Sequence, residues 1–282
     1  MRRLCQKSLF AIAVTIAVAT AAAPSIADEQ RASGLPLWEI GAVGLAVSQQ
    51  AYPGAAQRVN RGLALPYLIY RGEILRADRG GAGIRALKTP TFEIDIGVAA
   101  SFGSNTNDVE VRRGMPELGT RVEFGPRLKW HLGAGPGNGR LRAEFPLRSV
   151  FDLNDGLAHK GVAFEPRLIL EGRAPGGWNY STSIGALWGN RRLADTFYGV
   201  APVYATAGRA AYVADSGLVA WRLSAEFSRP LSSDLRLFTF ARVDSVAGAA
   251  NEDSPLVQRK AGASVGLGLA YTWRRSTRGA AD

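Results

Sequence analysis

The chain has 282 residues, a net charge of +10 and one cysteine, Cys5. It can form no internal disulfide, but its length is enough for one large domain or two small ones to bury a core without such links. Beyond the N-terminal region no run of 18 apolar residues occurs, which excludes helical membrane spans. Nucleic-acid motifs are absent, so we expect the excess charge to serve internal arginine–carboxylate pairs or anionic lipid head groups rather than nucleic acid.

The first predicted element is a secretory signal peptide over residues 1–27. A basic stretch at 2–7 precedes an apolar run at 9–23, and the SIA tripeptide that ends at Ala27 has the small-x-small pattern of a signal peptidase site. We therefore expect export from the cytoplasm and a mature chain that begins near Asp28.

Apolar and polar residues then alternate along most of the chain, the pattern of strands with one apolar face. Ten segments show it: 38–48, 63–72, 91–102, 121–132, 140–150, 161–173, 178–189, 217–227, 235–247 and 263–273. The stretches 74–88 and 204–213 would supply two more strands. Because a tilted transmembrane strand needs about nine to eleven residues, the sequence predicts an all-β fold, an antiparallel transmembrane β-barrel of ten to twelve strands over residues 28–273.

Alternation alone also fits a soluble β-sandwich or a periplasmic lipocalin-like barrel, in which the apolar face points inward. Aromatic residues near the strand ends favour the membrane barrel, because interfacial girdles place them there. A periplasmic N-terminus puts short linkers on the periplasmic side: 133–139, 174–177 and 229–234. Longer linkers then lie outside the cell: 49–62, 103–119, 190–216 and 248–262.

Two features depart from a regular barrel. Pro126, Pro146 and Pro166 fall inside predicted strands, where each removes a ladder hydrogen bond, so we expect bulges or positions near the rim. A basic tail, residues 274–282, follows the last strand, and we expect it to be disordered.

Charged side chains occupy the face opposite the apolar one. An arginine or lysine that faces lipid costs about 2–4 kcal/mol at the membrane midplane, so we expect this face to line the lumen, where opposite signs on neighbouring strands can pair. The predicted lumen-facing ionic ladder consists of Arg121, Glu123, Arg127, Lys129, Arg142, Glu144, Arg148, Glu165, Arg167, Glu171, Arg173, Arg222 and Glu226. A small, anion-leaning channel and a plugged interior both fit it, and the even mixture of acids and bases favours the plugged interior.

Side chains suited to catalysis or metal binding are few. Outer-membrane lipid hydrolases pair a histidine with a serine, and neither His131 nor His159 has one close in sequence, although Ser149 and Ser181 are open partners after folding. Two oxygen-rich sets suit either calcium or tight turns, and we favour turns: Asn105, Asn107 and Asp108, and Asn154 and Asp155. We predict no enzyme activity, no cofactor site and no metal site.

Pairs of basic residues in the long linkers could bind lipopolysaccharide phosphates through charge-assisted hydrogen bonds, or could simply be solvated. These pairs are Arg58 and Arg61, Arg112 and Arg113, Arg191 and Arg192, and Arg259 and Lys260.

Six short motifs occur together in the linkers and the adjoining strands: AYPGA at 51–55, LPYLIYRG at 65–72, RRGMPELGTRVEFGPRL at 112–128, DTFYGV at 195–200, AGRAAYVADSG at 207–217 and DSPLV at 253–257. In order and spacing the chain resembles the MltA-interacting protein (OmpV-like) family of Gram-negative outer-membrane proteins. The resemblance implies an outer-membrane β-barrel in contact with outer-membrane lipid. The family's namesake is thought to bridge a murein lytic transglycosylase and a murein synthase, and other members are described as porin-like or adhesive.

From this resemblance we expect a non-enzymatic scaffold linked to murein synthesis and turnover. The alternatives are a small porin-like channel or a surface adhesin, and more remotely an outer-membrane lipid hydrolase.

Overall fold

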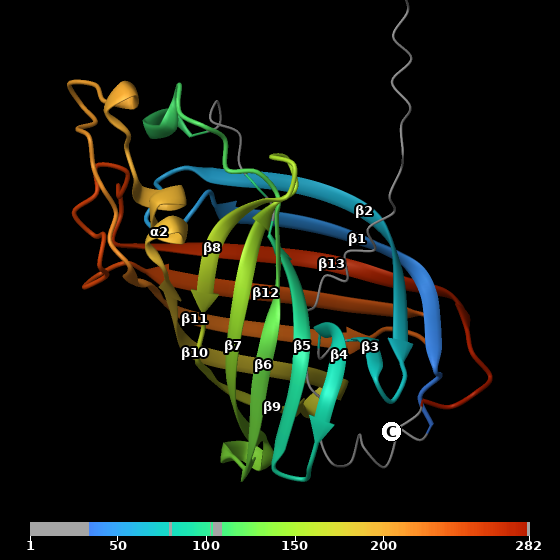
Figure 1. Cartoon of the computed structure of the whole chain (residues 1–282). Coiled ribbons are helices and arrows are strands. Elements are labelled where there is room, and N and C mark those ends of the chain that lie inside the picture. The colour runs from blue at the N-terminus through green and yellow to red at the C-terminus, as the bar shows by residue number, and fades with distance from the viewer. Residues whose placement is uncertain (1–33, 79–80, 102, 104–108, 281–282) are drawn as a thin grey trace, which may run out of the picture.

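The computed structural model describes residues 34–78, 81–101, 103 and 109–280, so the predicted signal peptide lies outside the described residues. These residues form one antiparallel sheet with a short helix, α2 (Arg191–Tyr198), in a connection (Figure 1). The strands are β1 (Trp38–Gln50), β2 (Arg58–Arg71), β3 (Leu75–Asp78), β4 (Gly81–Lys88), β5 (Phe92–Ser101), β6 (Arg121–Ala134), β7 (Arg140–Asp152), β8 (Ala158–Phe164), β9 (Arg167–Ala174), β10 (Trp178–Gly189), β11 (Gly217–Pro230), β12 (Leu235–Ser245) and β13 (Ala261–Arg275). Short 3-10 turns lie at Glu110–Arg112, Pro136–Asn138, Pro175–Gly177 and Pro202–Tyr204.

Two of these segments, β8 and β9, are halves of one strand, because both pair with β7 on one side and with β10 on the other. Counted in this way, the described residues form twelve antiparallel strands, which confirms the expected ten to twelve. Each strand pairs with the next along the chain, and β13 pairs with β1 from Glu39 to Ser48. The hydrogen-bonded pairing therefore returns to its starting strand (Figure 1).

The stretch 74–88 supplies both additional strands, since it folds into the hairpin of β3 and β4. The other candidate, 204–213, is not a strand, and that prediction was wrong. It contributes only isolated bridges, Val200 with Tyr212 and Thr206 with Arg209. The physical reason is that β10 and β11 pair directly with each other and leave no strand edge there for this stretch to join.

The connections differ in length between the two ends of the sheet. The end that carries both described termini has short connections: 72–74, 89–91, 135–139, 175–177 and 231–234. We call it the turn end. The opposite end, the loop end, carries the connections 51–57, 102–120, 153–157, 190–216 and 246–260. No helix among the described residues is both long and apolar enough to cross a membrane.

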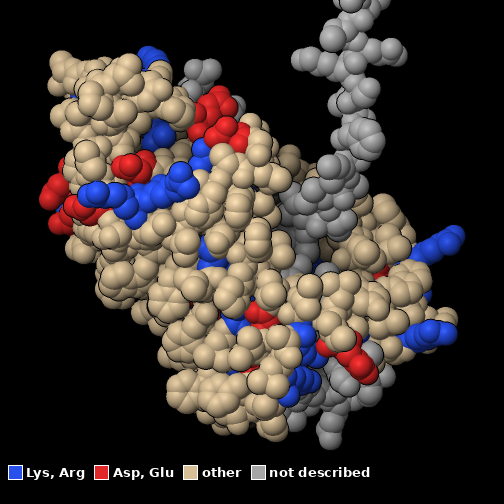
Figure 2. Space-filling view, in the orientation of Figure 1, with Lys and Arg blue, Asp and Glu red and all other residues tan. Residues whose placement is uncertain are grey.

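The two faces of the sheet have the reverse of the polarity found in soluble proteins. Apolar side chains on one face are exposed, such as Leu267 at 56% and Trp221 at 52%, whereas charged side chains on the other are buried, such as Glu144 at 1%. Figure 2 shows a largely uncharged surface over the middle of the strands, with charged side chains gathered over the loop end and again toward the turn end. A soluble sandwich or lipocalin-like barrel would bury the apolar face instead.

The three prolines lie where the strand pairing is irregular. Pairing between β6 and β7 is interrupted around Pro126, and Pro166 separates β8 from β9. The carbonyls of Pro146 and Pro166 still accept hydrogen bonds, from Glu165 N and Ala186 N, both at 3.1 Å. Of the two sequence-based explanations, a bulge-like irregularity within the sheet fits these prolines and a position at the rim does not.

Part of the buried face is apolar. On β1 it carries Val43, Leu45 and Val47, which cluster with Phe238 of β12. The glycines of β13 make room for this aromatic layer, because a side chain at Gly268 would collide with the Phe238 ring. The small residues of the last strand thus provide space for the aromatic rings of its neighbour.

The tail that was predicted to be disordered is paired in its described part. Residues 276–280 run beside the segment that precedes β1: Leu37 N donates to the Arg278 carbonyl at 2.8 Å, and Ala280 N donates to the Leu35 carbonyl at 2.7 Å. These bonds continue the seam between β1 and β13, which corrects the prediction.

Candidate functional site

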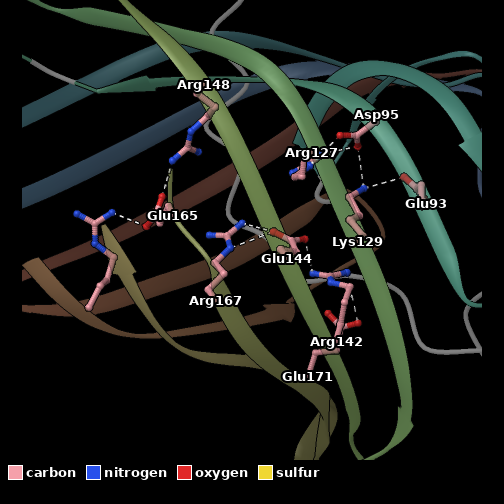
Figure 3. Close-up of polar contacts among 11 residues, drawn as sticks. Glu93, Asp95, Arg127, Lys129, Arg142, Glu144, Arg148, Glu165, Arg167 and Glu171 are labelled. Carbon is pink, nitrogen blue, oxygen red and sulfur yellow. Dashed lines mark hydrogen bonds and ion pairs between the residues drawn. The ribbon is translucent and has the colours of Figure 1, made fainter. Parts of the chain in front are cut away.

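The buried charged face begins with cross-strand pairs between β5 and β6. Asp95 and Arg127 are directly opposite, and the guanidinium meets both carboxylate oxygens, at 2.9 and 2.6 Å (Figure 3). Two residues further along β6, Lys129 Nζ lies 2.7 Å from Glu93 Oε1 and 3.0 Å from Asp95 Oδ2. Such bidentate, charge-assisted contacts fix the relative positions of both strands.

The next group of charges joins β7 to β9. Glu144 accepts from Arg167 Nη2 at 2.5 Å and forms an ion pair with Arg142, whose Nη2 lies 3.1 Å from Glu144 Oε1. Arg142 Nη1 also lies 3.7 Å from Glu171 Oε1 (Figure 3). Glu144 is held on two sides, and such contacts offset the desolvation penalty of a buried ionised carboxylate.

A third group is centred on Glu165, between β8 and β9. Its carboxylate pairs with Arg148 of β7 and, at 2.5 Å, with Arg222 of β11. Asp244 of β12 then accepts from Arg222 Nε at 2.8 Å and forms an ion pair with Arg242, whose Nε lies 3.1 Å from Asp244 Oδ2. The break at Pro166 thus places a carboxylate where it connects strands that are not neighbours.

Three residues of the predicted ladder are not part of these groups. Arg173 is exposed near the turn end. Arg121 is buried beneath the loops, and Glu226 has a buried carboxylate oxygen, Oε2, without a hydrogen-bond partner. Glu123, by contrast, forms an ion pair with Arg148, whose Nε lies 3.1 Å from Glu123 Oε2.

Sequence reasoning left several members out of the ladder. Glu93 and Asp95 stand on the polar side of the alternating segment TFEIDIG, and Arg242 and Asp244 alternate in ARVDS, so the same period-two signal marks them. Glu39, which pairs with Arg71 at 2.6 Å, is a single charge at the start of its strand.

A cavity of about 380 Å³ lies between the charged groups and the apolar part of the buried face, which we call the apolar wall. Leu45, Val47 and Phe240 line one side, and several of the paired charges line the other. At the loop end the cavity is bounded by Tyr52 and by Phe197 of α2.

The connections of the loop end pack together over this cavity and form what we call the loop cap. Four separate connections and the adjoining strand ends contribute its apolar cluster, whose buried members include Tyr52, Val109, Met115, Leu118, Leu193, Phe197, Tyr198 and Leu256. Asn190 begins α2 by accepting from Leu193 N at 3.1 Å, which orients the apolar side of the helix toward the cluster.

Hydrogen bonds tie the connections of the loop cap to one another. The Tyr52 hydroxyl donates to the Leu256 carbonyl at 2.8 Å, and the Ser254 hydroxyl donates to the Tyr198 carbonyl at 2.8 Å. Arg112 Nη1 donates to the Phe197 carbonyl at 3.1 Å. Burial raises the pKa of Tyr52 to about 12 and lowers the pKa of Arg112 to about 10, so at neutral pH the phenol is neutral and the guanidinium charged.

Five of the six motifs meet in this cap, and AGRAAYVADSG supplies Ala214. AYPGA supplies Tyr52, GMPELG supplies Met115, DTFYGV supplies Tyr198 and DSPLV supplies Leu256. The motifs that carry the family resemblance are therefore largely packing residues of one structure at the loop end.

The histidines lie at the two ends of the sheet. His159 stands 5.2 Å from the Phe151 ring, and its Nδ1 lies 3.4 Å from Arg192 Nη1. His131 is exposed on β6, where its backbone N donates to the Thr91 carbonyl. The two histidines therefore lie too far apart in the sheet to share one site.

The candidate calcium residues 105, 107 and 108 lie outside the described residues. Asn154 Oδ1 accepts from Thr120 N at 2.8 Å, and Asp155 pairs with Lys160 at 2.7 Å, so both shape the turn between β7 and β8. Among the described residues no group of three or more histidine, cysteine, aspartate or glutamate side chains is placed to hold a metal ion.

Several of the loop arginines and lysines are already in use. Arg112 is buried in the loop cap, Arg191 pairs with Asp215 at 3.0 Å, and Lys260 pairs with Glu252 at 2.9 Å. Fewer basic groups are therefore free for lipid phosphates than the sequence suggests.

The family model for MltA-interacting protein MipA matches residues 40–273. No protein with a curated description matches the chain. Among solved structures, OprB of Pseudomonas putida is similar at 7% identity, with 84% of this chain and 94% of that chain covered and a TM-score of 0.40. An outer membrane channel from Pseudomonas putida F1 is similar at 13% identity, with 85% and 97% covered and a TM-score of 0.37.

Proposed function

Because the chain belongs to the MltA-interacting protein (MipA) family, we propose that its ring of strands is a closed β-barrel in the outer membrane of a Gram-negative bacterium, where it binds protein partners rather than catalysing a reaction. The family name points to a murein lytic transglycosylase as one partner, and a murein synthase is the second that we propose.

The reversed polarity of the sheet is the observation that carries the membrane assignment. An exposed band of residues such as Ile184, Leu223 and Leu267 would be a large aggregation-prone surface in water, but it matches the hydrocarbon core of a bilayer. Exposed Trp130, Trp188 and Trp273 suit the aromatic girdles of such a barrel. Short periplasmic turns and long outer loops are typical of these proteins, which supports a periplasmic turn end.

The loop cap and the ion pairs support a closed scaffold over an open channel. Charges that pair across the interior occupy it, and the loop cap covers its outer end. Partners that act on murein reside in the periplasm, so we place their binding surface at the turn end, where Arg274 and Arg278 are exposed.

A charge-reversal comparison tests the scaffold. Arg274→Glu with Arg278→Glu changes the turn end, and Arg113→Glu with Arg259→Glu changes the loop end by the same charge at exposed positions. Affinity purification from mild detergent should recover the transglycosylase or the synthase with the wild type and the loop-end variant, and less of either with the turn-end variant. Repeated failure to recover both enzymes with the wild type would contradict the scaffold.

A small channel is the second candidate, favoured by the arginine-lined cavity of about 380 Å³. Purified protein in a planar bilayer should then give discrete conductance steps with a preference for anions. Silence of the wild type in this assay supports the capped scaffold.

A further inference from the structure

The ionic ladder between β5 and β6 changes where the cavity begins. Toward the turn end, the positions of β5 on the buried face carry Glu93 and Asp95, and both pair with cations of β6. The next positions on the same face are Gly97, Ala99 and Ser101, which line the cavity. β5 therefore offers no carboxylate to the loop-end half of β6, and these small residues leave room there instead.

Arg121 is the cation that this change leaves unpaired. It lies directly opposite Ser101, whose Oγ accepts one long hydrogen bond from Nε at 3.4 Å. Opposite it on β7 is Asp152, whose Oδ1 accepts from Asn154 N at 2.9 Å. The Arg121 side chain is 6% exposed, and among the described residues Nη1 has no hydrogen-bond partner and the guanidinium has no ion pair. A buried cation in this state is costly unless an anion joins it.

The loop cap adds positive charge around this group. Arg112 and Arg209 are also buried there, and both donate to backbone carbonyls rather than to carboxylates. Burial lowers the pKa of Arg112, and the charges of Arg121 and Arg209 lower it further, so the three guanidiniums act on one another. Two acids, Glu123 and Asp152, act on Arg121, and Glu123 is already paired with a cation of β7. The loop end of the cavity is therefore attractive to a single negative charge.

Apolar side chains enclose the same part of the cavity. The Arg121 guanidinium carbon lies 4.8 Å from the centre of the Phe197 ring, and such stacking leaves the edge of the guanidinium available for a carboxylate. Phe197 packs in one cluster with Val150, Leu187 and Leu193, and all four line the cavity. The cation and an apolar surface therefore border one space at the loop end.

We propose that this end of the cavity binds a small monocarboxylate with an apolar chain. Its carboxylate accepts hydrogen bonds from the free edge of Arg121, and its chain lies against Phe197 and the other apolar side chains of the cluster. The cavity volume of about 380 Å³ is within the range of small-molecule sites, so a short chain can be enclosed. The site requires neither a murein partner nor a continuous pore.

Isothermal titration calorimetry of the purified protein in detergent tests the proposal with three probes: hexanoate, hexanamide and acetate. Hexanoate has both the charge and the chain, hexanamide lacks the charge, and acetate lacks the chain. The wild type should bind hexanoate saturably and each of the other probes at least about tenfold more weakly. Blank titrations into detergent micelles correct for partition of the probes.

Three variants locate the site. Arg121→Gln should weaken binding of hexanoate by about tenfold or more without changing binding of hexanamide. Arg259→Gln removes an exposed cation of the loop end and should leave hexanoate binding unchanged. Ser101→Asp supplies a carboxylate directly opposite Arg121, so it should abolish hexanoate binding in a protein at least as stable as the wild type.

Two outcomes with the wild type would overturn the proposal: no saturable binding of hexanoate at millimolar concentration, or binding of hexanamide or acetate as tight as that of hexanoate. Unchanged hexanoate binding by folded Arg121→Gln would overturn it as well. The gel mobility of unboiled samples reports whether each variant retains its barrel, and the wild-type comparison stands even if a substitution prevents folding.

Discussion

Replacing Tyr198 by alanine is expected to open the loop cap while leaving the strands folded. The ring is 1% exposed and lies edge-on to Tyr52, with 6.4 Å between ring centres. Its hydroxyl donates to the Pro53 carbonyl at 3.1 Å. Loss of a buried aromatic ring costs about 3–5 kcal/mol, and loss of the hydrogen bond costs about 1 kcal/mol more.

Because the loop cap consists of connections, with only the ends of strands packed against them, we expect this loss to appear as local opening. A change of about 4–6 kcal/mol shifts the ratio of open to closed caps by roughly a thousandfold or more. Tyr198→Phe keeps the ring, so it should shift the ratio of open to closed caps by only about tenfold.

Trypsin cleavage after Arg209 measures this opening. Arg209 is 8% exposed, because its guanidinium donates to the Val111 and Tyr204 carbonyls inside the loop cap. On whole cells, Tyr198→Ala should be cleaved there much faster than the wild type, with Tyr198→Phe close to the wild type. If folded Tyr198→Ala resists cleavage as well as the wild type, Tyr198 does not hold the cap closed and the reasoning is refuted.

Three further substitutions test other parts of the structure. Glu165→Gln should lower the free energy of unfolding by about 3–5 kcal/mol in denaturant titrations in detergent, because Arg222 loses a charged partner, and an unchanged midpoint would show the pair to be unimportant. Leu267→Arg, on the exposed apolar face, should cost about 2–4 kcal/mol in lipid vesicles if the residue lies near the midplane, and a neutral result would argue against lipid contact. Asn190→Ala removes the acceptor of Leu193 N and should speed proteolysis of α2 with a loss of about 1 kcal/mol, whereas equal proteolysis would exclude a capping role.

Most strands were predictable from the sequence because apolar and polar residues alternate along them, and successive side chains of a strand point to opposite faces of the sheet. The hairpin of β3 and β4 was only an additional possibility in the sequence, because strands of four and eight residues show little alternation. The apolar wall was not predictable: Phe238 stands between Arg236 and Phe240 on the buried face, and a rule that sends apolar residues outward misplaces it.

The loop cap could not be predicted for a different reason. Tyr52, Val109, Tyr198 and Leu256 come from four connections with no common periodicity, and only the folded ring brings them together. The sequence predicts a charged face but not its pairings, which depend on strand register and on the break at Pro166.

The fit between Phe238 and the glycines of β13 restricts how this chain can change through evolution. A methyl group at position 268 has no room while a phenyl ring covers it, and a smaller residue at 238 would leave a void above the glycine. A Cβ at position 268 would also lie 2.7 Å from the Gly44 carbonyl oxygen, so a smaller ring at 238 does not by itself make room there. Relatives that keep this strand register are expected to keep glycine at 268, whatever residue they carry at 238.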